Sequence, residues 1–106
     1  MPERKNEQRV DAAAVQGAGA YVIVRPLTYG EAKAIRRRAA DLSEAEQSAL
    51  SDLLLIDKVV GWNWVDAAGQ PLPLPASDPG VLERLTLEEV TFLSAAVSGD
   101  PNVGGG

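Results

Sequence analysis

Three prolines in the middle of the chain constrain its fold more than any other local feature. They occupy alternate positions within Gln70–Pro75, and each lacks the amide hydrogen that a central β-strand must donate. Both tryptophans, Trp62 and Trp64, lie shortly before this segment. Residues 66–69, DAAG, carry a turn signature, because Asp can bond to its own backbone and Gly can adopt positive φ. We therefore predict a helix that ends at residue 61 and a small hairpin. Its first arm is Trp62–Val65, and its second is an edge arm or an extended segment.

The remainder of the chain is predicted to be mainly helical. Three Ser or Thr residues are each followed three positions later by Glu, which is the capping-box spacing that begins a helix. The expected helices span about residues 28–40, 43–60 and 86–97, with a shorter helix after the Ser-Asp-Pro signal at 77–79. Tyr21–Val24 is aromatic and β-branched and is expected to pair with Trp62–Val65. The predicted fold is mainly α (α+β), with four or so short-to-medium helices and a small two-stranded β element.

The two consecutive long helices carry opposite charge. Residues 28–40 are basic through Lys33 and the run Arg36–Arg38. Residues 43–60 combine an apolar stripe with an exposed acidic side that carries Glu44, Glu46, Asp52 and Asp57. The stripe is made of Ala45, Ala49, Leu53, Ile56 and Val60. A short link between the helices favours antiparallel packing, which would let the opposite charges face each other.

Composition removes several classes of function. The 106 residues contain no His and no Cys, which excludes thiolate nucleophiles, disulfides, imidazole bases and Cys/His zinc sites. The net charge of −5 argues against nucleic acid as a partner, although Arg36–Arg38 is the one basic run that would be tested for it. No apolar run has the roughly 20 residues needed to cross a bilayer, and no secretory signal is visible at the start. We expect a soluble intracellular protein without a membrane partner.

The domain organisation is predicted from polarity and glycine content. Residues 1–19 are expected to form a flexible N-terminal arm with a short helix near 10–15, residues 20–98 a single globular domain, and residues 99–106 a flexible Gly-rich tail. The carboxylates Glu88 and Glu89 lie in a first helical turn, where negative charge is stabilised by the helix dipole. This capping role explains them better than catalysis does, so no catalytic, metal or cofactor site is predicted.

The tryptophan pair is the sharpest candidate for a binding surface. Side chains two positions apart on a strand share a face, so Trp62 and Trp64 are predicted to point the same way. Their favoured role is in the core. The alternative is an apolar surface groove that receives a partner helix, formed by Trp62 and Trp64 with Leu72 and Leu74 of the following segment.

Three segments together resemble the tail assembly chaperones of long-tailed bacteriophages. They are VRPLTYGEAKAIR at 24–36, VVGWNWVDAAGQPLPLP at 59–75 and DPGVLERLTLEEVTFLSAAV at 78–97. The resemblance covers about Tyr21–Val97 and rests on turn and packing residues, so no functional residue is carried over from the family. It implies a non-enzymatic protein of the host cytoplasm that binds the tape measure protein during tail assembly and recruits tail tube subunits. Self-association is compatible with the sequence. A small structural protein of the tail or the head–tail connector is the alternative.

Overall fold

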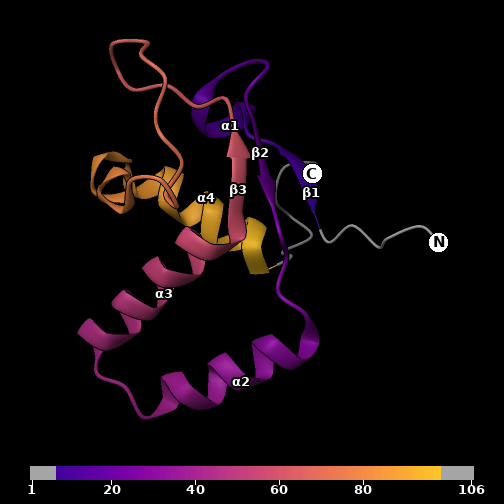
Figure 1. Ribbon diagram of the computed structural model, residues 1–106, viewed down its shortest axis with the longest axis vertical. Helices are drawn as coiled ribbons and strands as arrows, with labels where there is room; N and C mark the ends of the chain where they lie inside the picture. Colours follow the sequence, from indigo (N-terminus) through magenta and orange to yellow (C-terminus); the bar gives the residue numbers. More distant parts are fainter. Residues whose placement is uncertain (1–6, 99–106) are drawn as a thin grey trace, which may run out of the picture.

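A three-stranded antiparallel sheet lies at the centre of the structure, a computed structural model that describes residues 7–98 (Figure 1). Its strands are β1 (Gln8–Asp11), β2 (Tyr21–Val24) and β3 (Val59–Trp62), in the order β1-β2-β3. The predicted strand at residues 21–24 is confirmed and occupies the central position. Val22 and Val24 are fully buried, whereas their neighbours are partly exposed, which is the alternation of a strand with one face on the core.

The sheet has three strands, whereas a two-stranded β element was predicted. We expected residues 1–19 to be a flexible arm, but β1 pairs with β2 from Gln8↔Val24 to Asp11↔Tyr21. Ala12 is fully buried, and the short helix α1 (Ala13–Gln16) follows it. An edge strand is held by backbone hydrogen bonds and needs few apolar side chains, so its polar sequence gave little signal. Residues 1–6 and the predicted tail at 99–106 lie outside the described residues.

The predicted helix starts are confirmed. Helix α2 (Tyr29–Ala40) and helix α3 (Glu44–Lys58) each begin with a complete capping box, in which Thr28 and Ser43 accept hydrogen bonds from the Glu31 and Glu46 amides. The same reciprocal pair forms between Thr86 and Glu89 at the start of α4 (Leu87–Ser98). The short helix at Pro79–Arg84, η1, is a 3₁₀ helix whose Asp78 cap accepts from the Gly80 amide.

The strand that follows α3 begins earlier than predicted. We expected the helix to continue to Gly61 and the strand to occupy Trp62–Val65, but α3 ends at Lys58 and β3 starts at once. Its partners run from Val24↔Val59 to Val22↔Trp62, with an irregularity beside Val24. The helical periodicity extends past the true boundary because a β-branched pair, Val59 and Val60, fits either element, and pairing with β2 decides between them.

In place of the predicted hairpin, the structure has a turn and a single β-bridge. Val65 bridges Pro71, and the Leu72 amide donates to the Trp64 carbonyl at 2.9 Å. The turn itself is confirmed, since Asp66 Oδ1 accepts from two backbone amides, at residues 68 and 70. Gly69 has a φ of 80°, which favours glycine there. The segment after the turn is extended rather than a ladder strand, as its prolines require.

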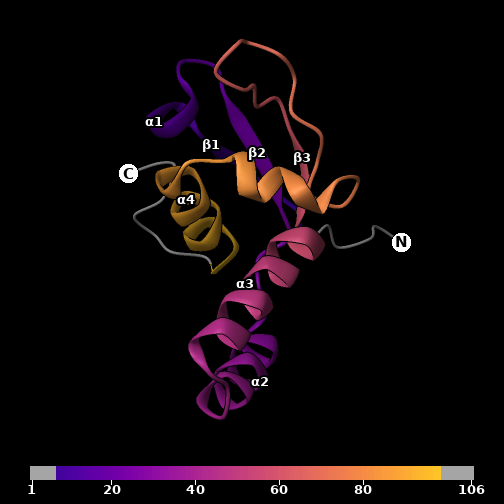
Figure 2. The ribbon, with the colours of Figure 1, turned by 90° about the vertical axis from the view of Figure 1, so that its left-hand side faces the viewer.

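The core lies between the sheet, α4 and the C-terminal end of α3. Trp62 and Trp64 point the same way and stack, with ring centroids 4.7 Å apart and an 8° interplanar angle. Figure 2 shows that α2 and the first turns of α3 extend away from the sheet and α4. The largest fully buried side chains are Trp64, Leu55, Leu93, Val22, Val24, Val59, Val81 and Pro75.

Candidate interaction surface

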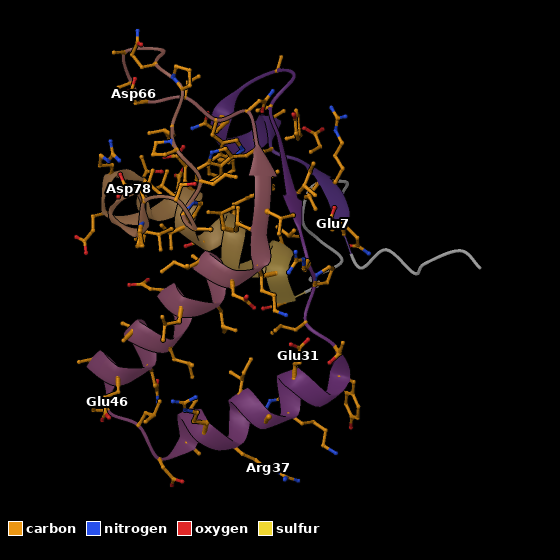
Figure 3. All side chains as sticks on the ribbon, in the orientation of Figure 1. Glu7, Glu31, Arg37, Glu46, Asp66 and Asp78 are labelled. Atoms are coloured by element: carbon orange, nitrogen blue, oxygen red, sulfur yellow. The ribbon has the colours of Figure 1, made fainter. Side chains whose placement is uncertain are left out.

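The helical hairpin formed by α2 and α3 is attached to the domain mainly through the end of α3. Helix α2 contains no buried residue. At one end of the hairpin, Gln47 Nε2 donates to the carbonyls of Ala39 at 2.8 Å and Leu42 at 3.2 Å. At the other, Lys58 Nζ lies 2.9 Å from Glu31 Oε2. These contacts hold α2 along one side of α3 (Figure 3).

The Lys58–Glu31 pair differs from the charge pairing that we expected. We predicted that basic residues of α2 would face acidic residues of α3, but within residues 7–98 the ion pair that joins the two helices uses an acid of α2 and a base of α3. Lys58 is 9% exposed and also lies 3.7 Å from Asp57. The pKa of Glu31 is lowered from its ordinary 4.5 to about 2, first because its carboxylate accepts from the Thr28 amide and second because it pairs with Lys58. The charged cap thus fixes the start of α2 against the end of α3.

The apolar stripe of α3 is largely exposed. Ala45, Ala49 and Leu53 recur every four residues and therefore share one face of the helix. All three are exposed, and Leu53 retains 60% of its accessible surface. The whole stripe was expected to be buried, opposite the exposed acidic side of the helix. The structure corrects that expectation for these three residues, whereas Ile56 and Val60 of the same stripe are half-buried and Ile56 packs against the core.

The stripe continues into an open apolar groove. Leu53 and Ile56 of α3 line a cavity of about 620 Å³ together with Leu74 and Ala76 of the segment that follows the turn. We call this cavity, together with the stripe, the α3 groove. The remaining residues that line the cavity are Arg25, Asp57, Val59 and Val60. An exposed helix face that runs into an apolar cavity is a surface to which a second helix can bind.

The four predicted partner-binding residues are divided between core and surface. Trp64 and Leu72 are buried, at 1% and 8% exposure, which supports the favoured core interpretation. Trp62 is half-buried, and its Nε1 donates to the Leu72 carbonyl at 3.1 Å. Leu74 alone of the four lines the α3 groove. The buried Trp64 Nε1 has no hydrogen-bond partner within residues 7–98.

The residues that sequence reasoning missed are Leu53 and Ile56. Both belong to the predicted stripe. The sequence did contain a signal that part of this stripe is exposed, because LLLI at 53–56 places more apolar side chains on the helix than one face can bury. Only Leu55 of the four is fully packed in the core. Which one is buried depends on how α3 rotates against its neighbours.

Three carboxylates of the described region, those of Glu31, Glu46 and Glu89, accept hydrogen bonds at helix starts. Glu46, like Glu31, has its pKa lowered because it accepts from the Ser43 backbone and side chain. Glu89 is buried, completes the cap of α4, and accepts from Gln16 of α1. The Gln16 side chain also donates a hydrogen bond to the Val65 carbonyl and accepts one from the Val65 amide. Gln16 therefore connects α1 to both the turn region and α4. Within residues 7–98, no three acidic side chains gather closely enough to hold a metal ion.

Comparison with known proteins adds no relative. No protein-family model matches the sequence, and searches of curated proteins and of solved structures gave no match. In the region from 7 to 98, the structure contains no helix long and apolar enough to span a membrane.

Proposed function

We propose that this protein is a tail assembly chaperone of a long-tailed bacteriophage, and that its α3 groove binds an amphipathic helical segment of the tape measure protein. Two lines of evidence support the proposal. The first is the resemblance of the segments at 24–36, 59–75 and 78–97 to that family. The second, which carries the proposal, is the exposed apolar face of α3 and its continuation into the groove.

A partner helix would match this surface in both shape and chemistry. Helix-in-groove recognition uses apolar anchors spaced by three or four residues, which meet complementary apolar side chains in the groove. Ala45 and Ala49 are small and permit close approach of a second helix, while Leu53 and Leu74 offer larger contacts. A long helical tape measure protein exposes such faces before the tail tube surrounds it. By covering one of them in the host cytoplasm, the chaperone keeps that chain soluble and accessible to tail tube subunits.

Co-expression with the tape measure protein of the same phage tests this proposal. The wild-type protein should raise the soluble fraction of the tape measure protein and co-purify with it. Leu53→Glu should lose both effects, because it places a charge on the apolar stripe. Leu87→Glu is the matched control, since Leu87 is 82% exposed on α4 and does not line the groove. The proposal fails if the wild-type protein leaves the solubility of the tape measure protein unchanged.

Purified virions distinguish the chaperone from the alternative, a structural protein of the tail or connector. A chaperone acts during assembly and should be missing from the peptides that mass spectrometry detects in finished particles. Detection in amounts comparable to known tail components would favour the structural role.

A further inference from the structure

The α3 groove has an acidic rim on both sides of its apolar floor. Asp52 follows Ala49 by three positions and precedes Ile56 by four, so it lies along one side of the stripe. Glu46 and Asp57 lie along the other side, because Glu46 precedes Ala49 by three positions and Asp57 follows Leu53 by four. All three are exposed, and Asp57 also lines the cavity. A helix that enters this groove therefore has carboxylates beside both flanks.

The cations near the groove are largely matched by other acids. Arg25 lines the cavity, but its Nε lies 4.0 Å from Glu7. Lys58 lies beside Asp57 at 3.7 Å, yet its closer partner is Glu31 at 2.9 Å. Within residues 7–98, no arginine of α2 forms an ion pair with Glu46, Asp52 or Asp57, and α2 contacts the opposite side of α3 through Gln47 and Lys58. When these cations and their acidic partners within residues 7–98 are included, the rim still has a net negative charge.

Building on the proposed function, we infer that the α3 groove selects an amphipathic helix whose apolar stripe is flanked by Lys or Arg. The apolar contacts supply most of the affinity, and the acidic rim supplies the selectivity, because exposed charges at an interface favour partners of opposite sign and reject partners of the same sign. The same rim opposes pairing of the α3 stripe with the α3 stripe of a second copy, where the carboxylates would face each other. The occupant is therefore a basic-flanked helix of a different protein.

Two synthetic peptides test the inference directly. Both are 18-residue helices with the same leucine stripe, one flanked by Lys and the other by Glu, and binding to the full-length protein is measured by fluorescence anisotropy. The Lys-flanked peptide should bind about tenfold more tightly, since three exposed charge pairs each contribute up to a few-fold. This preference should shrink as salt is raised from about 50 mM to 500 mM, because the Debye length falls well below 10 Å.

Charge-reversal variants assign the preference to the rim. The double variant Asp52→Lys/Asp57→Lys should bind the Glu-flanked peptide better than the Lys-flanked one. Glu83→Lys/Glu88→Lys is the matched control, because it makes the same change in net charge at exposed positions outside the groove and should keep the wild-type preference. Circular dichroism confirms that both variants are folded. Equal binding of the two peptides, or a preference unchanged in Asp52→Lys/Asp57→Lys, overturns the inference.

The peptide and co-expression experiments can fail separately. If the wild-type protein solubilises the tape measure protein but shows no charge preference among the peptides, the inference is wrong and the proposed function stands. If the peptides show the preference but the tape measure protein is not solubilised, the proposed function is wrong and the selectivity of the groove stands for a different helical partner.

Discussion

Two leucines on helices, Leu93 of α4 and Leu53 of α3, should respond very differently to truncation to alanine. Leu93 is completely buried, and Leu53 is 60% exposed. Both sit within helices, so the small gain in helix propensity from Leu to Ala is similar at the two sites. The difference in their effect on stability therefore measures burial.

The structure sets the expected size of this difference. Truncating a fully buried leucine removes its transfer free energy and leaves a cavity, so Leu93→Ala should lower the free energy of unfolding by about 3–4 kcal/mol. Leu53 buries only a minor part of its surface, and full burial of a leucine contributes about 1.5–3 kcal/mol, so Leu53→Ala should cost about 1 kcal/mol or less. The gap between the two variants is about 2 kcal/mol or more.

Urea denaturation followed by tryptophan fluorescence measures both values, because Trp62 and Trp64 stack in or against the core and report its loss. The Leu53→Ala variant should in addition bind the Lys-flanked peptide more weakly, while Leu93→Ala, where it remains folded, should not change that affinity directly. A loss of stability at Leu53 equal to that at Leu93 would refute the reasoning. It would mean that the stripe of α3 is covered in the isolated protein and is not available to a partner.

Three further predictions concern stability. Ala12→Leu should lower the free energy of unfolding in urea by about 1–3 kcal/mol, because Ala12 is fully buried. An unchanged urea midpoint would instead support the original prediction that the segment before β2 is a flexible arm. Gly69→Ala should cost about 1 kcal/mol because φ is 80° there, and a neutral result would place the turn in another conformation. The pKa of Glu31 is depressed from 4.5 to about 2, so the stability that its charge contributes is fully present above pH 4.5 and is lost as the pH falls through about 2. The stability difference between wild type and Glu31→Gln should therefore shrink over that range, and a constant difference would contradict the assigned pKa.

Local chemistry determined the helix starts and the turn. A Ser or Thr followed three positions later by Glu satisfies the free amides of a first helical turn within four residues, so Thr28, Ser43 and Thr86 needed no tertiary information. The Asp66 turn is equally local, since the side chain bonds to amides two and four residues further along. The central strand was also predictable, because its aromatic and β-branched run ends just before Pro26.

Tertiary structure alone decided the remaining features, because they depend on which segments meet. The polar strand β1 is stabilised by its backbone pairing with β2. Helix α3 ends and β3 begins at Val59, because β2 provides a hydrogen-bonding partner there. In α3, the sequence specified an apolar stripe but not the neighbours available to cover it. The sheet and α4 cover Leu55, α2 approaches through Gln47 and Lys58, and Leu53 is left exposed beside the groove. Periodicity identifies an apolar helix face, whereas its burial requires a second surface within reach, and only the packed chain shows where that surface is absent.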